Sequence, residues 1–184
     1  MGRMLFSLRA AMGILLTVLV GQSATAWELI PRNHLLYSDV AANSDPFFIL
    51  SANLDQDGQA ELIWCNWNNH RIDVFSIKER RFLDQKSVSG PFSLTLGDVD
   101  GDSVTDLLAP FDNRTTGENG IHFLKGKGDG TFEEATLLIS DVGKGRRCAV
   151  ADINGDAKLD VITPVGAKTG VFLNDGAGTF STAP

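Results

Sequence analysis

The stretch Asp98-Val-Asp-Gly-Asp-Ser-Val-Thr-Asp106-Leu107 decides the fold, because the same pattern occurs three times without gaps. Its counterparts are Asn53-Leu-Asp-Gln-Asp-Gly-Gln-Ala-Glu61-Leu62 and Asp152-Ile-Asn-Gly-Asp-Ala-Lys-Leu-Asp160-Val161. The similarity extends outward, since Pro46-Phe47 precedes the first copy as Pro91-Phe92 precedes the second. Copies that start about 50 residues apart predict a repeat architecture.

Each repeat contains short segments rich in Val, Ile, Leu and Phe, bounded by Gly, Asp and Asn, and this composition is typical of β-strands. First strands are expected at 47–52, 92–97 and 146–151, second strands after each acidic stretch, third strands at 71–77, 121–125 and 170–174, and fourth strands at 82–88 and 135–140. No window of the mature chain shows a helical period. The predicted fold is all-β, a propeller-like array of about three four-stranded blades.

The repeats cover about 45–91, 92–145 and 146–184, and three blades are fewer than the four to eight of a closed propeller. The third repeat ends without an expected fourth strand, and residues 34–40 could supply one and complete the last blade. Three forms remain open: an array that completes itself, an array doubled in a homodimer, and a fragment of a longer protein.

The first 26 residues have the three parts of a signal peptide: a basic start with Arg3 and Arg9, an apolar run over 10–20, and the small-residue site Ala24-Thr25-Ala26. The apolar run is about half of the roughly 20 residues that span a bilayer, so an uncleaved anchor is the weaker interpretation. We expect cleavage before Trp27, a secreted, periplasmic or cell-surface protein, and no membrane span after cleavage.

Charge and composition argue against several classes of function. The formal net charge of −7 argues against binding to nucleic acid. The histidines His34, His70 and His122 share no spacing, and no acid/base or nucleophile set stands outside the acidic stretches, so no enzymatic activity is expected. Trp64 and Trp67 could stack on a sugar, although packed aromatic residues are the more common case.

The acidic stretches are candidate metal-binding loops. Oxygen ligands at loop positions 1, 3, 5 and 9, with a carbonyl at position 7, suit a hard cation that takes six to eight oxygens, so calcium is favoured over magnesium, zinc and copper. The proposed ligands are Asn53, Asp55, Asp57, Gln59 (carbonyl) and Glu61; Asp98, Asp100, Asp102, Val104 (carbonyl) and Asp106; and Asp152, Asn154, Asp156, Lys158 (carbonyl) and Asp160. Loops two and three fit best, because loop one has Asn53 and the longer Glu61.

Two other interpretations of these loops fit the residues less well. An EF-hand needs a bidentate Glu at position 12 and helices on both sides, but position 12 is Trp64, Ala109 or Thr163 and the flanks indicate strands. A solvated turn could also use Asp, Asn and Gly. The threefold recurrence of the same spacing favours metal binding over such a turn.

Together with Phe123-Leu-Lys-Gly-Lys-Gly-Asp-Gly-Thr-Phe132 and its counterpart ending at Phe180, these loops resemble the FG-GAP and VCBS-type repeats of extracellular β-propellers, including the integrin alpha head. The resemblance implies one blade per repeat, with calcium held between the first two strands. The family usually has glycine at loop positions 4 and 6, and each loop here lacks one of the two.

The residues and the resemblance together indicate a calcium-binding module for extracellular recognition or adhesion, with an extracellular protein or a glycan as its ligand. The alternative is a fragment of a larger propeller-containing lectin or polysaccharide-acting enzyme. An internal disulfide between Cys65 and Cys148 is not expected, since their repeats are not neighbours, but a bridge across a dimer interface stays open.

Overall fold

The computed structural model describes residues 46–143 and 146–182, together with four short strands nearer the N-terminus. These are β1 (Leu8–Arg9), β2 (Leu15–Leu16), β3 (Trp27–Ile30) and β4 (His34–Tyr37), which form the antiparallel pairs β1–β2 and β3–β4. The chain divides into two compact units, Met1–Val40 and Ala41–Pro184. Most of the expected signal peptide lies outside the described residues, and the described residues include no helix that could span a membrane.

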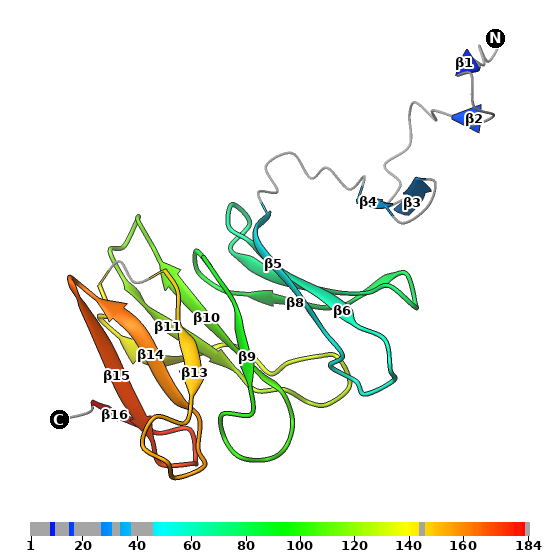
Figure 1. Cartoon of the computed structure of the whole chain (residues 1–184). Coiled ribbons are helices and arrows are strands. Elements are labelled where there is room, and N and C mark those ends of the chain that lie inside the picture. The colour runs from blue at the N-terminus through cyan, green and yellow to red at the C-terminus, as the bar shows by residue number, and fades with distance from the viewer. Residues whose placement is uncertain are drawn as a thin grey trace. The chain divides into compact units, whose positions relative to one another are not determined.

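The second unit consists of three four-stranded antiparallel sheets, which we call the first, second and third blades (Figure 1). The first blade contains β5 (Pro46–Ala52), β6 (Glu61–Asn66), β7 (Arg71–Ser76) and β8 (Arg81–Ser87); the second contains β9 (Thr95–Gly97), β10 (Asp106–Asp112), β11 (Asn119–Leu124) and β12 (Thr136–Ser140); the third contains β13 (Ala149–Ala151), β14 (Asp160–Val165), β15 (Lys168–Asn174) and β16 (Phe180–Thr182). Strands follow chain order within every blade. The described residues contain no helix, which confirms the all-β, blade-like fold.

Two expectations about the strands are corrected. The third blade has its own fourth strand, β16, whose residues pair with β15 from Phe172↔Thr182 to Asn174↔Phe180. The described part of 34–40, His34–Tyr37, pairs instead with Trp27–Ile30, and residues 38–40 lie outside the described residues. The inner strands β9 and β13 are also three residues long and begin later than expected.

Consecutive blades pack face to face through apolar side chains. We call the face of a blade toward the next blade in the chain its front face, and the opposite one its back face. Between the first and second blades, the front-face residues Ile63 and Cys65 meet the back-face residues Leu107 and Leu124 in one buried cluster. A second cluster joins the next pair of blades through residues that include Leu108, Ile121, Val161 and Phe172.

Alternation along the strands produces these two faces, because successive side chains of a strand point to opposite sides. Leu107 and Leu108 are adjacent in β10 and are both fully buried, yet they belong to different clusters. The second blade is therefore covered on both faces. The described residues provide no fourth blade, and the row of blades is not closed into a ring.

Hydrogen bonds reinforce both blade contacts. The Asp84 carboxylate of β8 accepts a hydrogen bond from the backbone N–H of Phe132 at 2.7 Å, which ties the first blade to the second. The Thr95 hydroxyl of β9 donates to the carbonyl of Cys148 at 2.8 Å, which ties the second blade to the third. These bonds satisfy polar groups at the edge of otherwise apolar contacts.

Candidate metal-binding site

Each acidic stretch forms the loop between the first and second strands of its blade: loop one joins β5 to β6, loop two joins β9 to β10, and loop three joins β13 to β14. All three loops turn through left-handed backbone conformations at positions 4 and 6. In each loop one of these positions is glycine and the other is not, the non-glycine residues being Gln56 (φ 60°), Ser103 (φ 69°) and Ala157 (φ 65°). A non-glycine residue in this region costs roughly 1–2 kcal/mol, so every loop holds some strain.

Carboxylates at the early loop positions organise the turns. Asp98 Oδ1 accepts from the N–H of Gly101 and Asp98 Oδ2 from the N–H of Ser103, both at 2.8 Å. Asp152 binds the N–H groups of Gly155 and Ala157 in the same way, and these backbone bonds hold the pKa of Asp152 below its usual range. The loops thus have a defined shape from their own hydrogen bonds.

The acid at position 9 is buried and bridges three parts of its blade. Asp106 Oδ2 accepts the N–H of Val99 and Asp106 Oδ1 the N–H of Gly126, both at 2.9 Å. Asp160 repeats this pattern, with bonds to the N–H of Ile153 at 3.0 Å and of Asn174 at 2.9 Å.

Glu61 binds the N–H of Leu54 at 2.9 Å, the position equivalent to Val99 and Ile153. The sequence indicated only a ligand at position 9. The structure adds a second role, because this carboxylate links the loop to the second strand and, in the second and third blades, to the end of the third strand as well.

Burial has an electrostatic consequence at position 9. Desolvation raises the pKa of Glu61 and of Asp106, and backbone hydrogen bonds from Leu54 and from Gly126 oppose that rise. A nearby acid, Asp55 or Asp100, adds to the rise through charge repulsion. A positive charge beside these carboxylates would favour their ionised form.

Two of the three loops bring carboxylates together. In loop one the carboxylates of Asp55, Asp57 and Glu61 lie with one oxygen each within 4.8 Å of one another. In loop two Asp98, Asp100 and Asp106 form an equivalent group. The donors are all oxygens, as a hard cation requires, so the residues fit calcium.

Loop three differs from the other two as a candidate metal site, and this changes the ranking of the loops expected from the sequence. Its position 3 is Asn154, and Asp152, Asp156 and Asp160 form no such group among the residues that the structure describes. The grouping of carboxylates therefore favours loops one and two, whereas the sequence favoured loops two and three. The carbonyl ligands proposed at Gln59, Val104 and Lys158 remain predictions.

A lysine from elsewhere in the blade lies against loop one and another against loop two, which the sequence alone did not indicate. Lys125 Nζ pairs with Asp100 and also with Asp102 Oδ2, the latter at 2.5 Å. Lys78 Nζ pairs with Asp57 Oδ2 at 2.6 Å. Loop three contains its own lysine, Lys158, whose Nζ lies 3.8 Å from Asp156 Oδ2 and donates to the carbonyl of Asp175 at 2.7 Å. These ammonium groups offset the negative charge that the clustered acids would otherwise concentrate. Lys78 follows β7 and Lys125 follows β11, and each of these strands pairs with the strand that directly follows the acidic loop, so only the strand pairing reveals the contact.

The remaining candidate residues have separate partners. His70 Nδ1 accepts the N–H of Gly90 at 2.9 Å, whereas His122 stacks on Phe111 with ring centroids 4.1 Å apart. Trp64 is buried near Phe82, and the ring of Trp67 lies under the Arg114 guanidinium. The contacts of both tryptophans agree with packed aromatic residues rather than with an open stacking platform.

Both cysteines are free thiols. Cys65 lies in the cluster between the first two blades, and Cys148 packs against the cluster between the second and third. Burial raises the pKa of the Cys65 thiol to about 12 and that of the Cys148 thiol to about 11.

Four-stranded blades in series, each with an acidic loop between its first two strands, define a class of all-β, propeller-like repeat proteins. Residues 113–163 match the family model of the FG-GAP-like repeat, so this part of the chain is an FG-GAP-like repeat. This match runs from the turn between β10 and β11, through loop three, into β14.

Comparisons with whole proteins add a structural neighbour. No curated protein matches the chain. Among solved structures, the chain is similar to an Agrocybe aegerita lectin described for its specific recognition of non-reducing terminal N-acetylglucosamine, with 25% identity and a TM-score of 0.50. The similarity covers 72% of this chain and only 36% of the lectin.

Proposed function

We propose that this protein is an exported, calcium-binding recognition module built from propeller-type blades. The observation that carries the proposal is the convergence of three carboxylates in loop one and again in loop two, within 4.8 Å in each case. Only oxygen ligands are offered, and extracellular modules commonly bind calcium through such loops with weak affinity. The FG-GAP-like repeat and the expected signal peptide support an extracellular setting.

In this proposal the loops hold the ion through their odd-numbered positions. Loop two would use Asp98, Asp100 and Asp106, with Asp102 turning from Lys125 toward the ion. Loop one would use Asp55, Asp57 and Glu61. The bound ion would stiffen a connection that already depends on backbone hydrogen bonds, so calcium acts as a structural support and not as a reagent.

Thermal unfolding with and without calcium tests the metal. At affinities of about 0.1 to 1 mM, about 2 mM calcium should stabilise the fold by roughly 0.6 to 1.8 kcal/mol per occupied site. Asp100→Asn should remove most of the response of loop two, and Asp55→Asn that of loop one. Asp129→Asn is the matched control, because Asp129 is an acid in a hairpin outside the loops. Unfolding curves of the parent protein that coincide with and without calcium would contradict the proposal.

A carbohydrate is the ligand class that we propose. The support is the similarity to a lectin over 72% of this chain. A glycan array that includes N-acetylglucosamine-terminated oligosaccharides, probed in calcium and in chelator, is the direct test. Binding to a defined glycan class would support the assignment, and an array without any specific signal would refute it and leave a protein ligand for the recognition module.

Export and the absence of enzymatic activity are two further parts of the proposal, and each can be tested by a separate measurement. Export predicts a mature N-terminus at Trp27, which mass spectrometry of the secreted protein can read. The absence of enzymatic activity predicts no turnover in hydrolase and lyase screens. Because the chain spans 36% of the lectin, the alternative of a piece of a larger lectin or polysaccharide-acting enzyme is tested by the mass of the natural protein.

A further inference from the structure

Three aromatic rings and two arginines gather at the end of the blades opposite the acidic loops. Neighbouring strands are antiparallel, so the turns between second and third strands and the links between blades lie at that opposite end. The ring centroid of Phe92 lies 5.2 Å from that of Phe47 and 6.0 Å from that of Trp67. The Cζ atoms of Arg114 and Arg146 lie 5.9 Å and 4.4 Å from the Phe92 centroid. We call these five residues the arginine–aromatic cluster.

Arg114 presents its guanidinium on a supported turn. It is exposed, and it forms no ion pair with any residue that the structure describes. Its Cζ lies 5.3 Å from the ring centroid of Trp67, and a guanidinium stacked in this way keeps its N–H donors free along its edge for both oxygens of a carboxylate. Asn113 Oδ1 accepts the N–H of Thr115 at 3.0 Å, and Asn113 Nδ2 donates to the Ser89 hydroxyl at 2.9 Å. The turn that carries Arg114 is therefore fixed by hydrogen bonds of its own.

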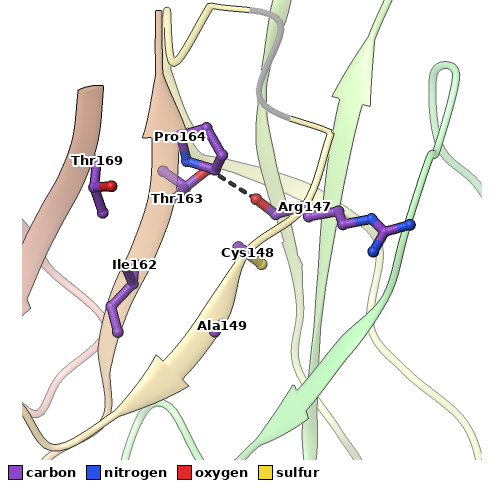
Figure 2. Close-up of a pocket in the computed structure, with 7 residues that line it drawn as sticks. All are labelled: Arg147, Cys148, Ala149, Ile162, Thr163, Pro164 and Thr169. Atoms are coloured by element: carbon purple, nitrogen blue, oxygen red, sulfur yellow. Dashed lines mark hydrogen bonds between the residues drawn. The ribbon is translucent and has the colours of Figure 1, made fainter. Parts of the chain in front are cut away.

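Arg146 adds a second positive charge beside the same ring. Its Nη2 lies 3.4 Å from Asp112 Oδ2, and its Nε is buried without a hydrogen-bond partner. The following residue is anchored, since the Thr163 hydroxyl donates to the carbonyl of Arg147 at 3.0 Å, the bond drawn as a dashed line in Figure 2. Two arginines and one aspartate leave this cluster with a net positive charge.

This positive charge is local, because the chain as a whole has a formal net charge of −7. The strands β6 and β10 are six and seven residues long, which places the acidic loops roughly 20 Å away, more than a Debye length at physiological ionic strength. Glu118, an acid near Arg114, accepts a hydrogen bond from the Thr116 hydroxyl at 2.8 Å. An anion that approaches this end therefore meets the guanidinium groups before it meets the loop carboxylates.

We propose that the arginine–aromatic cluster binds an acidic saccharide, with the sugar carboxylate on the guanidinium of Arg114 and the apolar face of the sugar ring on Phe47. Phe47 is 55% exposed, whereas Phe92 beneath the arginines is 4% exposed. A uronic acid combines an oxyanion with a flat apolar ring face, and the cluster combines a guanidinium fork with an open aromatic ring. The choice of a saccharide rests on the proposed function, while the need for an anion rests on the arginines.

Isothermal titration calorimetry with a short oligogalacturonate and with its methyl ester tests this site, because the ester keeps the rings and removes the charge. We expect the parent protein to bind the acidic form roughly tenfold or more tightly. Arg114→Gln should abolish this preference, and Arg114→Lys should restore part of it, since an ammonium lacks the planar fork. Arg80→Gln is the matched control: Arg80 is exposed in the hairpin between β7 and β8, and its replacement removes the same charge at the other end of the blade.

The sugar ring is tested by Phe47→Ala, which should raise the dissociation constants of both forms several-fold. Arg114→Gln and Arg80→Gln both keep the acidic loops, so a carboxylate held there through calcium would bind the two variants equally. Circular dichroism and melting curves establish that each variant is folded.

Three results would each overturn this assignment. The first is equal affinity of Arg114→Gln and Arg80→Gln for the oligogalacturonate, and the second is a parent protein that binds the methyl ester as tightly as the acid. The third is binding of an acidic peptide, such as polyglutamate, without binding of the oligogalacturonate. Specific binding of neutral glycans alone would also overturn it and leave the proposed carbohydrate function standing, so the two failures can be told apart.

Discussion

The side-chain amide of Asn174, at the end of β15, donates a hydrogen bond to the carbonyl of Val99 in loop two at 2.7 Å. The same amide also donates to the carbonyl of Leu159 at 3.0 Å, and Asn174 is almost fully buried. One side chain of the third blade therefore holds the candidate metal-binding loop of the second blade and the last turn of its own loop.

Replacement of this amide should destabilise the protein. Asn174→Leu leaves the carbonyls of Val99 and Leu159 without this donor, and we expect a loss of roughly 1–3 kcal/mol in the free energy of unfolding. Urea denaturation measures the loss. Asn69→Ala, at an exposed turn, should change the stability by less than about 0.5 kcal/mol. Equal effects of the two substitutions would show that the contact between the blades is not maintained in solution.

The bridging role of the position-9 acid predicts an effect that is independent of calcium. Asp160→Asn replaces one carboxylate oxygen with a donor that faces the N–H of Ile153 or Asn174. The buried mismatch should cost roughly 1–3 kcal/mol or more. The decisive measurement is thermal unfolding in chelator, where a pure ligand role predicts no loss.

Lys125 should compete with the ion at loop two. Its ammonium pairs with Asp100 and Asp102, so a calcium ion bound there would have to displace it or accept a nearby positive charge. We expect Lys125→Met to raise the calcium affinity of this loop several-fold. Isothermal titration calorimetry reads this affinity. Lys127→Met, which removes a lysine two residues further along, is the control, and an unchanged affinity in Lys125→Met would show that the ion pair does not compete.

His122 should make the protein less stable in acid. Burial lowers the pKa of His122, and a backbone contact at Thr136 offsets the shift in part. Below the ordinary histidine pKa of about 6.5 the unfolded chain therefore binds a proton that the folded chain does not, and stability falls as the pH falls. Melting temperatures between about pH 7 and pH 5 should drop less in His122→Phe than in the parent protein. Because all other titrating groups are shared, identical slopes would exclude this histidine as a contributor.

The two thiols should be unreactive in the folded protein. With pKa values of about 12 and about 11, Cys65 and Cys148 have little thiolate near neutral pH. A chromogenic disulfide reagent should modify them slowly until denaturant is added. Cys65 is buried between the first two blades, and Cys148 packs against the cluster between the second and third, although it also lines the hollow on the third blade that Figure 2 shows. Because neither thiol ionises readily, we expect no disulfide-linked dimer on non-reducing gels.

Much of the fold follows from local sequence. The run Leu107-Leu108-Ala109 after an acidic turn predicts β10, and a counterpart in each repeat predicts β6 and β14. The strand β16 was missed because Phe180 is its only apolar residue, so its pairing with β15 depends on the hairpin and not on its own pattern. The sequence thus predicts the strands that follow the acidic loops, but it does not predict that the third blade has a fourth strand.

The positions of the acidic loops could be predicted from the sequence, but the hydrogen bonds and ion pairs that these loops make with other strands could not. Spacing alone identifies Asp106 as an inward-facing acid, whereas its bond to Gly126 requires the register between β10 and β11. The ion pair between Lys125 and Asp100 likewise joins residues that only strand pairing brings together. The contact between Lys125 and loop two, and the hydrogen bond from Gly126 to the position-9 acid, therefore depend on strand register, which the sequence alone does not give.

The strand order has a consequence for how the protein is made. Within every blade, each strand pairs with the strand that precedes or follows it in the chain, so most backbone pairing is local and can form quickly. A chain that leaves the ribosome N-terminus first could therefore fold one blade at a time, and each new blade would shield the apolar front face of the blade before it. Among the described residues no blade follows the third, so this order of folding shields the front faces of the first and second blades and leaves that of the third without such a cover.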